Sequence, residues 1–339
     1  MHHKLTTAIT FSTITSDAAI YVHKQTNNIV ILAIHVDNVM SFRNSVAGLW
    51  DAHLQLHKIF DLTEEDPNWI MGFKPVEDWA EHTILIDHSP YIDAILCQFN
   101  MLECDPIDTP MDTNRTLSKL DGPVNNAEKQ AMSEHPYWEL IGTPIWISVT
   151  SCPHISFVAM HLVKFNVNPG DAHWRTKKWA GRYLKGTQHQ QLTLVLGLGN
   201  ATEPVLYTEL DWGCDEDNYC SMSGYVTFPG DSAFSWCSKQ QPTVTRSSTE
   251  GEYMAHSLTG WQRLWLPHVL YGLGLNLLDL PTSIFIDNWG AIDLSKDNWH
   301  HQQTKHIDIQ HHFIQECVDN NTFDITHILG NYNLQEIQQ

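Results

Sequence analysis

Residues 206–228 read LYTELDWGCDEDNYCSMSGYVTF, and this stretch decides the fold of the second half of the chain. Two runs rich in β-branched and aromatic residues, 205–208 and 223–228, flank a polar segment, which is the pattern of two neighbouring strands. Glu209 and Asp211 follow the first run, and side chains two residues apart on a strand share one face. The stretch therefore predicts a sheet that carries two carboxylates on one side.

The residues that follow continue with alternating strand and helix patterns. Glu252 falls in the first turn of a predicted long helix, and Asp287 ends a predicted strand. The order β-β-β-α-β-α-α-β indicates a mixed α/β domain. Beyond the first two strands, the expected elements are a strand at 234–237, a helix from about 249 to 272, a strand at 283–286, a helix near 289–295, a His-rich helix at 304–318 and a strand at 323–328.

Acidic side chains from these separate elements could converge on hard cations. Glu209, Glu252 and Asp287 are the candidate ligands, with Asp211 as a further candidate. Two Mg²⁺ ions about 4 Å apart would activate a water and stabilise the leaving oxygen of a phosphodiester. The alternative interpretation is that each acid is a solvated surface charge or a helix cap.

On the N-terminal side, residues 105–135 are rich in Pro, Asp, Asn and Ser, which predicts an extended connector. The other elements expected in this half are a β-hairpin over 19–36, a helix over 45–60, a strand pair at 69–75 and 83–87, a short helix at 91–99, and helices over 136–165 and 170–186.

The composition is that of a folded, acidic protein. Of 339 residues, 42% are hydrophobic, which is enough for a buried core and excludes a wholly disordered chain. The 19 Lys and Arg residues stand against 39 Asp and Glu residues, so the formal net charge is −20. Such a charge repels phosphate backbones at long range, and any nucleic-acid contact therefore needs a local cationic patch.

Several sequence features bear on location and cofactors. The first residues are polar and lack the apolar core of a signal peptide, and the longest apolar run, 29–34, is too short to span a bilayer. Seven Cys without a CxxC pair fit reduced thiols. We expect an intracellular protein, cytoplasmic or nuclear, that is neither secreted nor bound to a membrane. The Gly-Leu-Gly segments at 197–199 and 272–274 lack the third glycine of a dinucleotide fingerprint, so no nucleotide cofactor is expected.

Residues 173–185 supply a cationic patch. Their basic side chains recur at helical spacing with aromatic residues between them, and Lys177 adds a fifth cation. Such a face could contact the phosphates of a nucleic acid, and an ordinary solvated helix face is the alternative. The four residues with this spacing are Arg175, Lys178, Arg182 and Lys185.

Four segments of the second half follow one another in order: 206–228, SWCSKQQPTVTRSSTEGEYMA at 235–255, FIDNWGAIDL at 285–294 and TKHIDIQHHFI at 304–314. They resemble the ribonuclease H domain of Ty1/copia-type retrotransposon Pol polyproteins.

The first half agrees with this resemblance. IYVHKQTNNIVILAIHVDNVM at 20–40 resembles the segment around the family's Tyr-Val-Asp-Asp polymerase motif, and similar segments follow at 91–111, 137–165 and 173–187. The resemblance runs from about residue 18 to 337.

The resemblance implies an α/β (α+β) fold in three parts. A reverse-transcriptase palm remnant would cover 1–75, a thumb/connection-like region with the extended linker 105–135 would cover 76–200, and a ribonuclease H-like mixed β-sheet domain with helices would cover 201–339. It further implies two Mg²⁺ ions, an RNA/DNA hybrid or other nucleic acid as partner, and other Pol or capsid chains as additional partners.

By the same resemblance, the catalytic carboxylates of the nuclease fall on Glu209, Glu252, Asp287 and Glu336. The family has Asp where this chain has Glu209 and Glu336. The extra methylene moves each carboxylate about 1.5 Å outward, whereas productive geometry tolerates about 0.5 Å. We therefore expect a ribonuclease H-type hydrolase that is weakened by drift.

The polymerase motif of the family is less well preserved than the nuclease motifs. Its paired carboxylates have become Asp37 and Asn38, and an amide is a weaker Mg²⁺ ligand. The chain also begins after the upstream strand that carries a further carboxylate, so we expect reverse transcriptase activity to be lost. The alternatives to a nuclease are a catalytically inactive remnant that binds nucleic acid and a host-recruited interaction protein.

Overall fold

The computed structural model describes residues 11–25, 28–36, 38–43, 53–58, 60–63, 72–112, 114–195, 205–228, 230, 232–274, 281–296 and 308–330. The chain divides into two compact units. Unit 1 comprises Met1–Asp66 and Gly260–Leu280, and unit 2 comprises Pro67–Thr259 and Pro281–Gln339.

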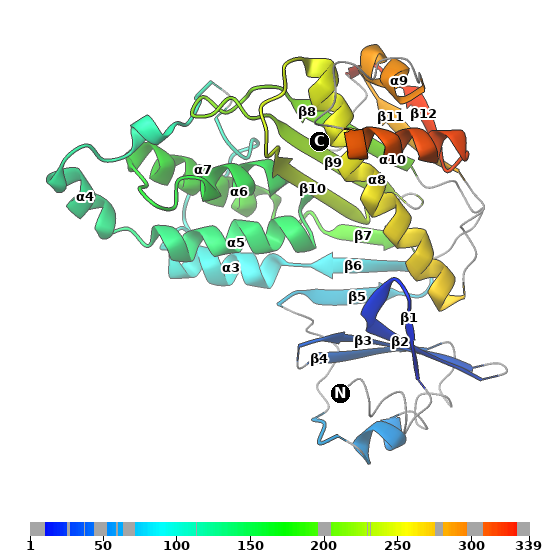
Figure 1. The fold of residues 1–339 in the computed structure, drawn as a ribbon. Coiled ribbons are helices and arrows are strands. Elements are labelled where there is room, and N and C mark those ends of the chain that lie inside the picture. Colours follow the sequence, from blue (N-terminus) through cyan, green and yellow to red (C-terminus); the bar gives the residue numbers. More distant parts are fainter. Residues whose placement is uncertain are drawn as a thin grey trace. The chain divides into compact units, whose positions relative to one another are not determined.

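Unit 1 contains a four-stranded antiparallel sheet in the order β1-β2-β3-β4 (Figure 1). The predicted hairpin over 19–36 is confirmed as β2 and β3, whereas β1 and β4 are additional strands. Tyr21 and Val22 point to opposite faces, and Val22 packs with Val269 of helix α8 (Ser248–Leu273). Only 53–57 of the predicted helix over 45–60 lies within described helical residues. The strands are β1 Ser12–Ile14, β2 Asp17–Gln25, β3 Asn28–His35 and β4 Asn38–Arg43.

The first part of unit 2 is a group of helices with a small antiparallel sheet, β5-β6-β7. Its core is built from side chains such as Ile147, Ile155 and Leu162, each almost fully buried. The strands are β5 Lys74–Asp78, β6 Thr83–Asp87 and β7 Leu192–Val195. The helices are α3 Ser89–Gln98, η1 Lys119–Asp121, α4 Asn126–Ser133, α5 Tyr137–Thr150, η2 Pro153–Ile155, α6 Ser156–Val163 and α7 Asp171–Thr187.

The predicted extended connector over 105–135 is wrong in its second part, which contains η1 and α4. The polar residues that suggested a connector are helix caps here. Ser118 accepts a hydrogen bond from Leu120 N at 3.1 Å, and Asn125 accepts one from Glu128 N at 2.9 Å. Short polar side chains satisfy the first N–H groups of a helix, so their abundance marks helix starts as well as loops.

The second part of unit 2 is a five-stranded mixed sheet in the order β10-β9-β8-β11-β12. β8, β9 and β10 pair antiparallel, and β11 pairs parallel with both β8 and β12. The predicted element order of this part is confirmed. Its elements are β8 Val205–Asp211, β9 Met222–Phe228, β10 Ser235–Gln240, α8 Ser248–Leu273, β11 Thr282–Ile286, α9 Trp289–Lys296, α10 Asp308–Asp319 and β12 Phe323–His327.

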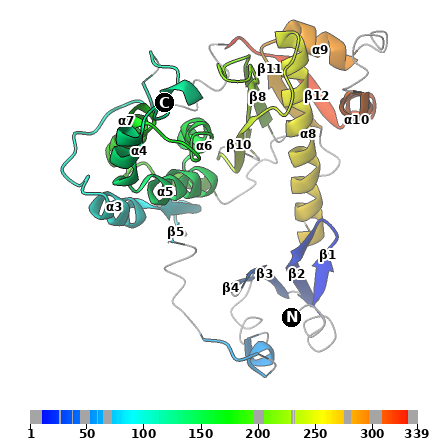
Figure 2. The same ribbon diagram turned by 60° about the vertical axis from the view of Figure 1, so that its left-hand side comes forward.

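One face of this sheet is covered by helices (Figure 2). Leu206 and Ile284 face Tyr253 of α8, while Ile292 of α9 and Ile314 of α10 extend the same core. Apolar residues every second position on the strands therefore fix which face packs and which stays open. The described residues together form a mixed α/β fold with three sheets. None of the helices in these residues combines the length and apolar character needed to cross a bilayer.

A tight backbone contact at Gly170 fixes the approach of α7 to η1. A Cβ at this position would lie 1.8 Å from Asp121 O, closer than two such atoms can approach. We predict that Gly170→Ala lowers the free energy of unfolding by about 2 kcal/mol or more.

Gly142 provides the matched control, because it is exposed within α5 and an added Cβ would meet nothing within 4 Å. Gly142→Ala should stabilise the chain by about 0.5–1 kcal/mol, since alanine is the better helix former. Urea denaturation followed by circular dichroism measures both, and equal effects of the two changes would contradict the contact.

Candidate active site

Strand β8 presents two of the predicted carboxylates on its open face. Its even-numbered residues from Leu206 to Leu210 are buried under the helices, while Glu209 and Asp211 lie on the other side, as their spacing predicts. Burial raises the pKa of Glu209 to about 7, with further contributions from the charges of Asp287 and Asp211. Glu209 is thus half-buried among other acids.

The parallel pairing of β11 with β8 places Asp287. In the register of these strands Phe285 lies beside Tyr207. Continuing the register by two residues brings Asp287 beside Glu209. Parallel strands end at the same edge of a sheet, so both carboxylates are delivered to one place.

Helix α8 brings Glu252 to the same place. The close approach of α8 to β8 depends on Gly251, because a Cβ there would lie 2.6 Å from Leu210 Cδ2. Gln241 Nε2 donates to Gly251 O at 2.9 Å and holds this turn of the helix. The Glu252 side chain is consequently enclosed, and the residue is only 6% exposed.

The three carboxyl groups lie close enough to repel one another. Burial raises the pKa of Glu252 to about 9, and the charges of Asp287 and Glu209 contribute to the shift. Glu252 Oε2 is buried and has no hydrogen-bond partner among the described residues. A buried carboxylate without a partner is costly unless a proton or a cation neutralises it.

Two neighbouring acids have other environments. Glu250, two residues before Glu252 on α8, accepts a hydrogen bond from Arg246 N at 2.8 Å. Asp211 is the most open of the candidate ligands on β8. Burial raises the pKa of Asp211, while a hydrogen bond from Cys214 and the charge of Lys164 oppose the rise.

The donor chemistry of this cluster fits Mg²⁺. Carboxylate oxygens are its preferred protein ligands, and the unpartnered Oε2 of Glu252 would be satisfied by a cation as well as by a proton. The side chains do not surround a metal position in this structure. Within the described ranges, no group of three His, Cys, Asp or Glu side chains is placed so that it could hold a metal ion. The residue types therefore suit Mg²⁺, whereas the side chains would have to move closer together to bind the ion.

Two of the sequence-predicted residues, Glu336 and Asp37, lie outside the described residues. Asn38, the partner of Asp37 in the predicted polymerase remnant, is the first residue of β4 and is exposed. It pairs with His35 across the turn between β3 and β4.

Helix α7 carries the predicted cationic face, and half of that face makes internal contacts. Arg182 Nε donates to Asp105 O at 2.6 Å. Lys185 Nζ donates to Cys104 O at 2.7 Å and also to Leu102 O. These two cations therefore hold the segment after α3 against α7.

The other half of the face is open. Arg175 is exposed and forms an ion pair with Asp171 at 2.8 Å, also at the surface. Lys178 is exposed, with its Nζ 5.8 Å from the ring centroid of Trp174. A nucleic-acid role of this helix accordingly depends on Arg175 and Lys178.

Lys177 does not belong to the cationic face, in contrast to its assignment as a fifth surface cation. The residue is only 1% exposed, and its Nζ donates to Tyr137 O and lies 3.8 Å from the Tyr137 ring centroid. Burial lowers the pKa of Lys177 to about 7. Helical spacing turns this residue about 100° away from Lys178, onto the side of α7 that packs in the core.

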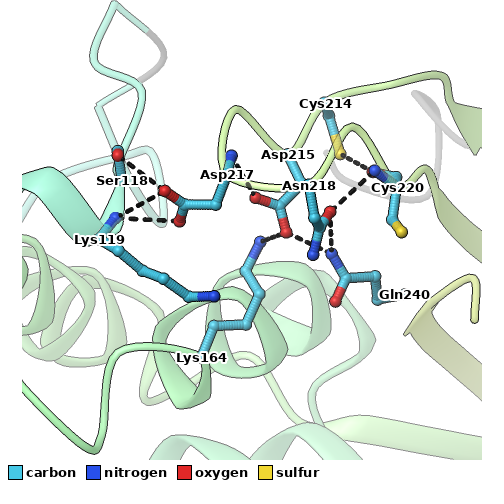
Figure 3. A network of polar contacts seen from close by, with 9 residues as sticks. All are labelled: Ser118, Lys119, Lys164, Cys214, Asp215, Asp217, Asn218, Cys220 and Gln240. Carbon is cyan, nitrogen blue, oxygen red and sulfur yellow. Dashed lines mark hydrogen bonds and ion pairs between the residues drawn. The ribbon is translucent and has the colours of Figure 1, made fainter. Parts of the chain in front are cut away.

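A polar joint, which was not expected from the sequence, connects the two parts of unit 2 (Figure 3). Asp217, on the loop between β8 and β9, accepts hydrogen bonds from Ser118 Oγ at 2.9 Å and from Lys119 N at 2.9 and 3.0 Å. Asp215 on the same loop is buried and forms an ion pair with Lys164 at 3.1 Å.

The loop itself is built for this contact. Asp215 accepts a hydrogen bond from Asp217 N at 3.0 Å, which is the local geometry that Asp and Asn favour in turns. Gln240, at the end of β10, donates to the same Asp215 carboxylate. The sequence predicts the acidic run after β8 as a polar segment between two strands. Its hydrogen-bond partners lie about 50 and 100 residues away along the chain, so no local pattern indicates them.

Comparison with known proteins gives relatives over nearly the whole chain. No protein-family model matches it. It is 34% identical over 323 residues, 94% of its length, to the retrovirus-related Pol polyprotein from transposon TNT 1-94 of Nicotiana tabacum. It is 29% identical over 314 residues to the Pol polyproteins from transposons RE2 and RE1 of Arabidopsis thaliana.

The chain spans 21–24% of the length of these curated relatives, so it corresponds to about a quarter of such a polyprotein. The similarity covers both of its compact units. The identities of 29–34% over more than nine-tenths of the chain, together with the motifs quoted above, show that its homologues are Ty1/copia-type retrotransposon Pol polyproteins.

Proposed function

We propose that this chain is a fragment of a Ty1/copia-type Pol polyprotein whose activity is ribonuclease H-type, Mg²⁺-dependent hydrolysis of RNA in RNA/DNA hybrids. The observation that carries the proposal is the meeting of acids from three separate elements. Burial raises the pKa of both Glu209 and Glu252, and the charge of Asp287 adds to both shifts. The observed order of elements from β8 to β12, which is the order read from the family-like segments, adds support.

The chemistry follows from the residues. Two Mg²⁺ ions, when bound, supply an activated water and stabilise the leaving oxygen of the phosphodiester. Glu252, Asp287 and Glu209 would hold the ions, and only their deprotonated forms are ligands. The raised pKa of Glu252 means that it keeps its proton near neutral pH until a cation takes the proton's place.

The same residues account for a weak enzyme. Glu209 stands where the family has Asp, so its carboxylate reaches further from β8 than the family's geometry requires. A misplacement of about 1 Å in a catalytic group can cost two orders of magnitude in rate.

We propose that polymerase activity is lost. The polymerase motif reads Asp37-Asn38 in this chain. A neutral amide on β4 replaces one of the two carboxylates on which metal-dependent polymerisation depends, and it binds Mg²⁺ more weakly than a carboxylate.

Substitution at the carboxylates tests the nuclease. With a labelled RNA/DNA hybrid and Mg²⁺, Glu252→Gln should lower cleavage by at least about 100-fold, because a ligand charge is removed. Glu209→Asp should raise cleavage about tenfold or more, because it shortens the misplaced side chain. Initial rates of hybrid cleavage on denaturing gels measure both changes.

Glu250→Gln is the matched control, since Glu250 lies two residues from Glu252 on the same helix and its Oε2 accepts a hydrogen bond from Arg246 N. It should cleave like the parent chain. An active protein in which Glu252→Gln cleaves as well as Glu250→Gln would contradict the proposed ligand set.

The acid cluster also predicts a pH dependence of stability. In the unfolded chain Glu252 titrates near its ordinary value of 4.5, whereas in the folded chain its pKa is about 9. The folded state therefore binds the extra proton between these values, and its stability falls as pH rises from about 5 to 9.

Glu252→Gln, a neutral replacement of similar shape, should remove this part of the loss. The melting temperature should fall more steeply between pH 5 and pH 9 in the parent chain than in the variant, and added Mg²⁺ should reduce the difference. Parallel profiles for the two proteins would show that Glu252 is not the titrating group.

A second candidate function is binding of nucleic acid without cleavage, and the exposure of Arg175 and Lys178 favours it. Such binding would depend strongly on salt because phosphate contacts release counterions.

For this candidate, changing Arg175 and Lys178 together to Ala should weaken hybrid binding and reduce the slope of log K against log salt by about 1–2. The melting temperature should stay unchanged. Lys185→Ala should lower the melting temperature and leave the salt slope unchanged, because Lys185 binds carbonyl groups of its own chain. Fluorescence anisotropy at several salt concentrations measures the binding, and an unchanged slope in the double variant would exclude this face.

A further inference from the structure

A pair of stacked rings lies beside the acid cluster. Trp289, the first residue of α9, is 62% exposed. Its ring is stacked on that of His327, with the centroids 4.1 Å apart and the planes 10° from parallel. One face of the indole is therefore supported by the imidazole, while much of its remaining surface is open to solvent.

The pair is anchored to the candidate active site. His327 Nε2 donates to Asp287 O at 3.2 Å, which orients the imidazole from the backbone of a proposed ligand residue. Asn288 Oδ1 accepts from Ala291 N at 3.1 Å and caps α9, which fixes the start of the helix that carries Trp289. Trp289 itself is only two residues from Asp287.

The way in which Trp289 is held carries more weight than its exposure. A single exposed aromatic residue is ordinary on a protein surface. Here the indole is held flat against a second ring that is itself tied to the backbone of Asp287. A preorganised open aromatic face of this kind is what nucleobases stack on in single-stranded nucleic-acid sites.

We infer that Trp289 and His327 form a stacking platform for one unpaired or terminal nucleobase of the substrate. Inside a duplex both faces of each base are already covered by its neighbours, so the platform is reached only by a base at a strand end, a gap or an unpaired position. Because Asp287 is adjacent, that base lies close to the scissile phosphate. This inference rests on the proposed function and narrows its substrate to hybrids that carry such a base.

Binding without cleavage tests the platform. Two RNA/DNA hybrids of the same duplex sequence are compared by fluorescence anisotropy in Ca²⁺, one with a three-nucleotide single-stranded overhang and one with both ends closed by non-nucleotide linkers. The parent chain should bind the overhang hybrid about tenfold more tightly. Trp289→Ala should lose this preference and bind both hybrids with the affinity of the closed one, while Trp289→Phe should keep part of it.

Trp138→Ala is the matched control, because Trp138 is 65% exposed on α5 and contributes nothing to the acid cluster. It should retain the full preference. Circular dichroism and melting temperature verify that each variant is folded. If Trp289→Ala keeps the preference, or weakens binding of both hybrids equally, the platform is refuted.

The outcomes separate the platform from the function on which it rests. A parent chain that binds and cleaves both hybrids equally refutes the platform and leaves the nuclease standing. A parent chain that binds neither hybrid refutes both. Retention of the preference by Trp289→Ala together with loss in His327→Ala would also refute the stack, because the two rings are proposed to act as one surface.

Discussion

The parallel pairing of β11 with β8 is the constraint on which the candidate site depends. Up to β8 the sheet is antiparallel, and from β8 onward it is parallel, so the ends of β8 and β11 meet at one edge. Ile284 and Ile286 of β11 must face the helices, where they join the core around Tyr253. A slip by one residue would bury Asp287 and expose the isoleucines, and the apolar alternation therefore also positions the acid.

The acids at this edge of the sheet destabilise the fold. Glu252 is enclosed, lacks a partner for Oε2 among the described residues, and feels the charges of Asp287 and Glu209. Residues of this kind reduce stability at neutral pH, and groups of strongly perturbed carboxyls occur mainly where binding or catalysis requires them. The raised pKa values of Glu209 and Glu252 are therefore the physical reason for proposing them as ligands together with Asp287.

Local patterns in the sequence predicted the second half well and long-range contacts poorly. Every element from β8 to β12 was expected in order, because alternation and helical spacing are properties of neighbouring residues. β7 was not expected, since its four residues form a strand only by pairing with β6, more than 100 residues earlier. Lys177 looked like its exposed neighbours but lies in the core, and Arg182 and Lys185 bind carbonyl groups that no local pattern indicates. The candidate carboxylates could be predicted because their residue types and the family-like motifs around them are local features of the sequence.

The joint between Asp215 and Lys164 has a consequence for how such a sequence can diverge. Both groups are largely enclosed, and they come from segments about 50 residues apart in the sequence. Loss of either one alone leaves a solitary charge inside the protein, which costs far more than losing the pair. A substitution at one of these two positions therefore destabilises the folded state unless the other position changes as well. This constraint holds whether or not the protein has nuclease activity.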